Sequence, residues 1–193
     1  MSKGFNLQSQ TSSSLKATHA LAIYSNIDSM LYNALHFLKK GIENNEVVVL
    51  LSDNFSKQGL VELGNLYENN DISTQNAGTV VLSGVMGTYF LGSQEKFNDQ
   101  KVLWSWMEMV REAEHLGKGL RVFVDLHRMF HHNIFEDLIN CKSEVNSALQ
   151  GCHNSNPVLK IINGCLEKDV IRLAPESFRL LQQHHSCVYL IPN

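Results

Sequence analysis

The chain lacks the features that a membrane or a nucleic acid would demand. No apolar run approaches the roughly 20 residues of a membrane-spanning helix, and the first residues hold no apolar segment like the core of a signal peptide. The formal net charge is −3 over 193 residues, so there is no basic excess to neutralise a phosphate backbone. These absences predict a cytoplasmic protein with no direct nucleic-acid partner and no membrane contact.

Cysteine is scarce, and its spacing is not that of a redox or zinc motif. The four cysteines form no CxxC pair and lie in the C-terminal third of the chain. They are Cys141, Cys152, Cys165 and Cys187. Cysteines of this kind in a reducing compartment are expected to be thiols.

A phosphate-binding loop is missing from the place where one would be expected. Residues 19–53 read as strand, turn, long helix and strand, which is the opening βαβ unit of a nucleotide-binding fold. A P-loop would place a Gly-rich run ending in Lys and Ser/Thr at the turn. Residues 24–29 are instead YSNIDS, with no Gly and no Lys. We therefore expect no NTP cofactor and a use of the scaffold other than NTP hydrolysis.

The rest of the pattern alternates short apolar runs with amphipathic segments. Runs rich in Val, Ile or Leu predict strands at residues 19–24, 46–52, 79–83, 120–125, 158–163 and 186–190. Apolar residues at three- and four-residue spacing predict helices at residues 28–43, 55–68, 99–116, 134–150 and 174–184. This alternation predicts an α/β fold in three layers, with a mainly parallel central sheet and helices on both faces.

The chain divides into a tail and one domain. Residues 1–17 are polar and rich in Ser, which predicts a flexible N-terminal tail. Residues 18–193 are expected to form a single domain. Residues 84–98 show no clear period, so they are expected to form a lid or a small subelement. Trp104 and Trp106 lie two residues apart and cannot share a helix face, so one should enter the core and the other should face a partner, a second subunit or the 84–98 loop.

Polar residues follow several of the predicted strands. In an open α/β sheet the ligand crevice lies beyond the carboxyl ends of the strands, so the residues leaving the strands are candidate ligand contacts. They are Tyr24, Ser25, Asp28, Asp53, Asp125, His127, Cys165 and Glu167. The structural alternative is that acids such as Asp28 and Asp53 only cap helices.

Asp125 ends an apolar strand, as does the carboxylate that holds Mg²⁺ in P-loop enzymes. Without Lys and Ser/Thr partners it has no nucleotide to serve. Paired with Glu144 it could run acid/base hydrolysis, but nothing supplies a nucleophile or an oxyanion site. We therefore expect that the protein is not an enzyme.

Histidine is grouped in two places. The weak metal candidates are His127, His131, Cys152 and His153. Their spacing matches no established zinc motif, so we expect no metal. His184 and His185 end the last predicted helix, where the helix dipole favours imidazolium; a pH- or metal-responsive pair is the functional alternative.

Several short segments, taken in order, resemble one family. They are HALAIY (residues 19–24), FLKKGIENNEVVVLLSD (37–53), Tyr89, GLRVFVD (119–125), Glu144 in CKSEVNSAL, Cys165, and His184-His185. Their order and spacing resemble the MEDS domain, the sensory domain named for methanogens, methylotrophs and the regulator DcmR. The resemblance departs at two places: Leu166-Glu167 stands where the family often has Tyr-Asp, and residues 125–128 (DLHR) replace a more open, Gly-containing segment.

The resemblance implies a RecA/KaiC-like fold with a degenerate P-loop and a sensory role. It also points to His19, Tyr89, Arg121, Glu144 and His184. Together with five of the strand-end candidates, the predicted ligand contacts are His19, Tyr24, Asp28, Tyr89, Arg121, Asp125, Glu144, Cys165, Glu167 and His184. The implied effector is a small molecule such as a C1 or hydrocarbon-derived compound. The implied partner is a signalling protein, either a histidine kinase or a transcription regulator, and self-association into a homo-oligomer is a further route for the signal.

Three functions follow in order of support. The first is a non-catalytic sensory domain that binds a small effector and passes a signal to a partner regulator. The second is a structural or regulatory RecA-like subunit without a small ligand. The third, the least supported, is a metal-binding protein or an enzyme.

Overall fold

The central feature of the fold is one six-stranded sheet, seen in a computed structural model that describes residues 17–54, 80–83, 90–91, 96–131, 137, 139, 141, 145 and 158–192. The strands are β1 (Ala17–Tyr24), β2 (Val47–Leu51), β3 (Val80–Ser83), β6 (Leu120–Asp125), β7 (Leu159–Leu166) and β8 (Cys187–Ile191). Their order is β3-β2-β6-β7-β1-β8, and every neighbouring pair is parallel. The predicted parallel α/β sheet is confirmed.

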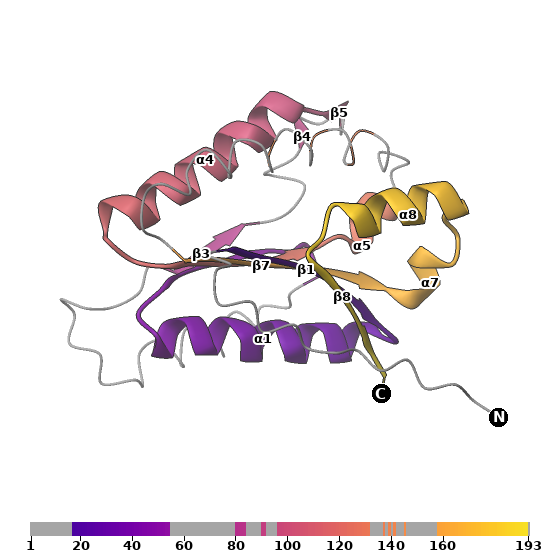
Figure 1. The fold of residues 1–193 in the computed structure, drawn as a ribbon, viewed down its shortest axis with the longest axis horizontal. Coiled ribbons are helices and arrows are strands. Elements are labelled where there is room, and N and C mark those ends of the chain that lie inside the picture. Colours follow the sequence, from indigo (N-terminus) through magenta and orange to yellow (C-terminus); the bar gives the residue numbers. More distant parts are fainter. Residues whose placement is uncertain are drawn as a thin grey trace.

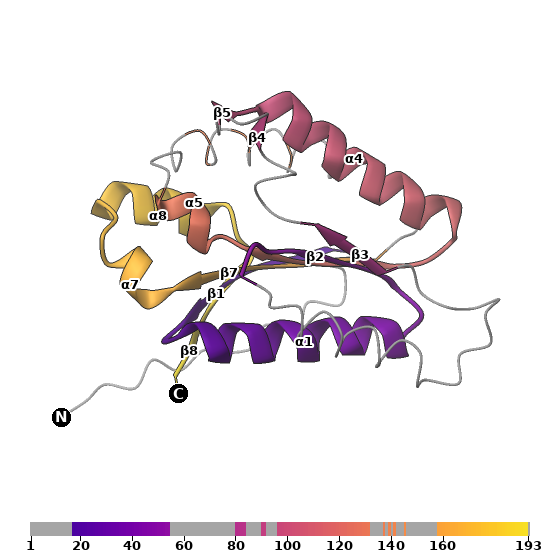
Figure 2. The same ribbon diagram turned by 180° about the vertical axis from the view of Figure 1, so that it is seen from behind.

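Helices cover both faces of this sheet, as predicted (Figure 1). Helix α1 (Ile27–Glu43) lies along one face, and α4 (Asp99–His115) and α8 (Pro175–Gln183) lie on the other, which the view from behind in Figure 2 also shows. Two short helices, α5 (His127–His131) and α7 (Glu167–Val170), follow the strands β6 and β7. Strands β4 (Phe90–Leu91) and β5 (Lys96–Phe97) pair antiparallel, so part of the 84–98 segment is a small subelement.

Each face of the sheet has its own core. Met30, Ala34, Leu38 and Ile42 recur every four residues on α1 and are at most 1 % exposed, because this spacing puts them on one stripe facing the sheet. Burying each large apolar side chain contributes about 1.5–3 kcal/mol to stability. On the opposite face Trp106 of α4 is buried at 5 % exposure, whereas Trp104 is 61 % exposed. The prediction that one of the two tryptophans enters the core is confirmed; what the other one faces stays a prediction.

The helix ends follow from local chemistry. The Asn26 side chain caps α1 by accepting a hydrogen bond from the Ser29 amide at 2.8 Å, so Asn26 is the N-cap and Asp28 lies in the first turn. A carboxylate there is stabilised by the helix dipole. Asn98 caps α4 in the same way, accepting from the Lys101 amide at 2.7 Å. Gly117, with φ of 63°, ends the turn after α4 in a conformation that suits glycine.

Some predicted boundaries were wrong. Strand β7 runs to Leu166 rather than to residue 163, so Cys165 lies inside the strand and Glu167 begins α7. The helices α5 and α7 were not predicted, because four or five residues are too few to show a helical period. The predicted helix at residues 55–68 lies outside the described residues. Within 134–150, the described residues 137, 139, 141 and 145 are helical.

Candidate functional site

Asp125, the acid that ends β6, is held in a closed network at the carboxyl edge of the sheet. Its side chain is buried, at 1 % exposure. Oδ2 accepts hydrogen bonds from Ser52 Oγ and Asn54 Nδ2, both at 2.7 Å, and Oδ1 accepts from the His127 amide at 2.9 Å. Since Ser52 and Asn54 follow β2, this carboxylate ties together the exits of two neighbouring strands.

The same network continues to the next strand. The His127 ring contacts Asp169 of α7, with 2.5 Å between Nδ1 and Oδ2. Asp169 is 1 % exposed. We call Ser52, Asn54, Asp125, His127 and Asp169 the carboxyl-end cluster. Its members bind one another across the exits of β2, β6 and β7, so they hold the strand ends together.

The other strand-end candidates differ widely in exposure. Tyr24 is 2 % exposed and Cys165 is fully buried. Burial raises the pKa of the Tyr24 hydroxyl well above its usual range, and the neighbouring Cys165 thiol raises it further. Glu167, at the start of α7, is exposed. A ligand could reach Tyr24 or Cys165 only if the surrounding side chains moved, and their role as effector contacts stays a prediction.

A second polar group lies inside the sheet on the face opposite α1. Asn163 of β7 is 2 % exposed, and its Nδ2 lies 2.6 Å from His19 Nε2 and 2.8 Å from His185 Nε2. His185 Nδ1 lies 2.6 Å from the Leu181 carbonyl oxygen. Because a carbonyl only accepts, Nδ1 carries a proton, and Nε2 of a neutral ring then accepts from the Asn163 amide.

This His–Asn–His cluster contains one of the two histidines predicted as ligand contacts. The ring centroid of His19 lies 4.5 Å from that of His185, whereas His184 is the C-cap of α8; the role of His19 and His184 as ligand contacts stays a prediction. Sequence reasoning missed Asn163. The available signal was a polar residue within an apolar run that is otherwise typical of a buried strand.

Arg121 lies near the other end of the sheet from Asp125. Its Nε pairs with Glu46 Oε2 at 2.5 Å, and Lys160 Nζ pairs with Glu46 Oε1 at 2.5 Å. Arg121 also donates to the Phe37 carbonyl oxygen at 3.1 Å, and its guanidinium lies 4.7 Å from the centroid of the Phe37 ring. We call Glu46, Arg121 and Lys160 the amino-end cluster, since each lies at or beside the start of its strand.

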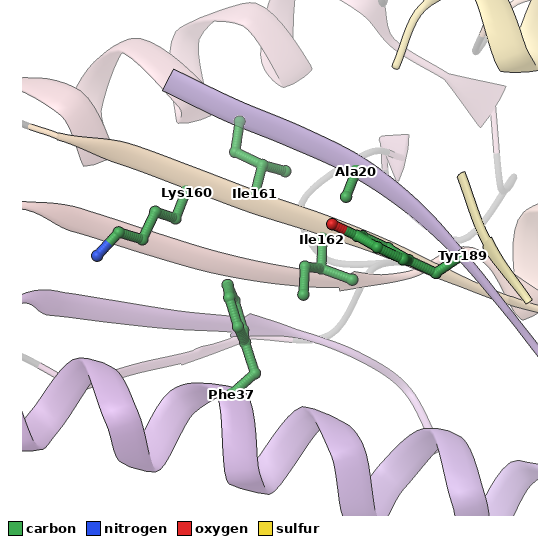
Figure 3. A pocket seen from close by; sticks show the side chains of 6 residues that line it. All are labelled: Ala20, Phe37, Lys160, Ile161, Ile162 and Tyr189. Atoms are coloured by element: carbon green, nitrogen blue, oxygen red, sulfur yellow. The ribbon is translucent and has the colours of Figure 1, made fainter. Parts of the chain in front are cut away.

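Beside this cluster the described residues line a pocket of about 210 Å³ between α1 and the sheet (Figure 3). We call it the α1 pocket; it is lined by Ala20, Phe37, Lys160, Ile161, Ile162 and Tyr189. Figure 3 shows the Tyr189 ring reaching from β8 across the sheet, with its hydroxyl toward Ile162 and Ala20. A hydrogen bond with the Cys187 side chain raises the pKa of Tyr189 above its usual value. The pocket therefore combines apolar walls with the Tyr189 phenol, and the Lys160 side chain runs along its edge with the ammonium directed away from Tyr189 (Figure 3).

Sequence reasoning missed the α1 pocket. Its residues come from α1, β7, β1 and β8, and they meet only because β7 and β8 both flank β1 in the sheet. No single segment carries a pattern that marks a site.

The remaining candidates do not gather into a metal centre. Within the described residues, no three or more His, Cys, Asp or Glu side chains lie close enough together to hold a metal ion. His131 ends α5. Tyr89, Glu144, Cys152 and His153 lie outside the described residues. No described helix is long and apolar enough to cross a membrane.

Comparison with known protein families gives a match over most of the chain. The sequence model of the family described as MEDS, the MEthanogen/methylotroph, DcmR Sensory domain, matches residues 18–155. That range stops before β7 and β8, which complete the same sheet. No curated protein and no solved structure matches the chain.

Proposed function

Because this chain belongs to the MEDS family of sensory domains, we propose that it is a non-catalytic sensory domain that binds a small effector in the α1 pocket. The observation that carries the proposal is the pocket itself. Ala20, Phe37 and Ile162 give it apolar walls, and the hydroxyl of Tyr189 offers a polar contact inside it. Pockets of this composition are the usual sites for small ligands.

The volume of the pocket suits a molecule of a few heavy atoms. A closed apolar cavity of about 150 Å³ accepts benzene, so the 210 Å³ of the α1 pocket has room for a molecule of that size or slightly larger. Hydrocarbon-derived compounds and C1 compounds fall within this limit. Nucleotides are much larger, and we propose that the domain uses no NTP.

The walls of the pocket supply a route for a signal. They belong to α1 and to β8, and each of these elements also has an exposed side: Tyr32 of α1 is 72 % exposed and Leu190 of β8 is 74 % exposed. An effector that binds one arrangement of α1 and β8 more tightly would shift the population toward it. A partner, such as a histidine kinase, a transcription regulator or a second copy of the domain, would read the altered surface.

The absence of catalysis is supported by the carboxyl-end cluster. The Asp125 carboxylate already accepts hydrogen bonds from three donors within the protein. A catalytic acid or base needs an open position beside the reacting group. We also propose that the domain is related to the RecA/KaiC ATPases and that Asp125 is the remnant of a metal-binding position.

The second candidate is a structural or regulatory subunit without a small ligand. The observation that favours it is the same closed cluster, since no unsatisfied carboxylate oxygen remains at Asp125 to attract an effector. In that case the α1 pocket would be a packing defect.

A pocket-filling variant separates the two candidates. Ala20 is 1 % exposed and forms part of the pocket floor, so Ala20→Leu should occupy the ligand volume. Thermal-shift and calorimetric screens against haloalkanes, alcohols, thiols and short acids should find binding to the wild type and at least about tenfold weaker binding to Ala20→Leu, which is about 1.4 kcal/mol.

Tyr189→Phe is the matched control for pocket volume, because it keeps the ring. It should still bind apolar compounds. Equal binding to the wild type and to Ala20→Leu would place the ligand elsewhere, and a flat response of the wild type to every compound would favour the structural subunit.

A further inference from the structure

We propose that the effector of the α1 pocket is a small monocarboxylate whose carboxylate pairs with the Lys160 ammonium and whose apolar body lies against Phe37 and Ile162. This inference rests on the proposed function and adds the chemical class of the ligand. It follows from the charges of the amino-end cluster and from its position at the rim of the pocket.

The amino-end cluster carries more positive than negative charge. Glu46 supplies one carboxylate, with one oxygen on Arg121 and the other on Lys160. Two cations therefore share one anion, and among the described residues no second carboxylate pairs with either of them. The cluster has a net charge of +1. An anionic ligand at the rim would bring the group to neutrality, and partial burial would strengthen that attraction.

Lys160 is the cation that a ligand can reach. Its side chain is 32 % exposed, whereas that of Arg121 is 8 % exposed. An ammonium has three donors, and the contact with Glu46 occupies one of them. A ligand carboxylate can accept one of the others, which gives a charge-assisted hydrogen bond.

The rest of the pocket fits the other half of such a ligand. Phe37 and Ile162 present apolar surface between the rim and Tyr189 (Figure 3). The Tyr189 hydroxyl already donates to the Cys187 side chain, so toward a ligand it can only accept. A monocarboxylate no larger than benzoate can place its carboxylate at Lys160 and its ring on the apolar surface within about 210 Å³. A dicarboxylate would bring a second charge onto the apolar floor, where it would lose hydration without a partner.

Benzoate and benzamide test the ligand class, because they have nearly the same shape and differ in charge. Calorimetric titration of the full chain should find that benzoate binds at least about tenfold more tightly than benzamide. Lys160→Gln should weaken benzoate at least about tenfold and leave benzamide within about twofold. Tyr189→Phe keeps the ring that lines the pocket and should leave benzoate affinity within about twofold of the wild type.

Lys40→Gln is the matched control. Lys40 lies in the last turn of α1 but is exposed and paired with Glu43, so it should leave benzoate affinity unchanged. Equal affinity for benzoate and benzamide, or no response to Lys160→Gln, would overturn the carboxylate inference while the pocket remained a ligand site. Failure of benzoate, benzamide and every neutral compound to bind would overturn the proposed function as well.

Discussion

The two ends of the sheet use buried charge in opposite ways. At the carboxyl end, Asp125 accepts two hydrogen bonds from the exit of β2 and one from the His127 amide, and the His127 ring contacts Asp169. At the amino end, one carboxylate is shared by two cations, beside a pocket. The first arrangement is complete within the protein. The second leaves a positive charge that a ligand can neutralise.

The comparison teaches where this scaffold has kept room for a ligand. Nucleotide-binding α/β proteins use the carboxyl ends of their strands. Here Asn26, rather than a glycine-rich loop, begins α1, and the buried acids Asp125 and Asp169 at that edge bind groups of the protein itself. The available volume described here lies over the first half of β7, on the α1 face.

Replacement of Glu46 by Ala should have the largest effect on stability. It would leave Arg121, which is 7 % exposed, as a buried cation without its carboxylate. Breaking a buried pair in this way costs about 3–5 kcal/mol. Urea unfolding followed by circular dichroism measures the loss.

The control for Glu46→Ala is Glu43→Ala, which removes a carboxylate from an exposed pair with Lys40. Exposed pairs contribute little, so that variant should unfold as the wild type does. If both variants unfold at the same urea concentration, the amino-end cluster is not the buried electrostatic unit described here.

Asp125→Ala should have the next largest effect. It leaves Ser52, Asn54 and the His127 amide without their shared acceptor. Because these three donors are only partly buried, water can replace part of the lost hydrogen bonding. We expect a loss of about 2–3 kcal/mol in the free energy of unfolding. Benzoate affinity, measured on the folded variant, should stay within about twofold of the wild type. A large loss of affinity without a change in fold would move the site to the carboxyl end.

Tyr24→Phe should have a smaller effect, confined to alkaline pH. The folded-state pKa of Tyr24 is raised above its ordinary value of 10.0, so the neutral phenol is favoured by folding. That contribution is fully present below the unfolded pKa and is lost as pH rises above it. One unit above the unfolded pKa the loss is about 1.4 kcal/mol.

The measurement is the urea midpoint at neutral pH and at one unit above the unfolded pKa of tyrosine. The wild type should lose more stability between the two conditions than Tyr24→Phe does. If the wild type and Tyr24→Phe lose the same stability at alkaline pH, the Tyr24 hydroxyl is not held in its neutral form by burial.

Much of the fold could be predicted from sequence because its signals are local. The run VVVLL of β2 is buried on both faces, and such a run is typical of a central parallel strand. The period of α1 identified both the helix and the face it buries. Helices as short as α5 and α7 depend on the geometry of the strand exits. They are too short to show a periodic pattern of apolar residues, so the sequence did not predict them.

The candidate site could not be predicted in the same way, because it depends on strand order. Glu46 and Lys160 lie 114 residues apart in sequence, and Tyr189 reaches the pocket only because β8 pairs with β1. From sequence, Arg121 and Asp125 were both predicted as ligand contacts. They belong to one strand, but the structure pairs them with different partners at its two ends.

Mapping a bound ligand by amide chemical shifts tests the central claim most directly. Benzoate, or whichever compound of the screen binds, is titrated into the folded chain while the backbone amide signals are followed. The account predicts shifts concentrated at Phe37, Ile162 and Tyr189, with Asn54 and His127 unmoved. Shifts concentrated at Asn54 and His127, with the amides of the α1 pocket unmoved, would contradict it.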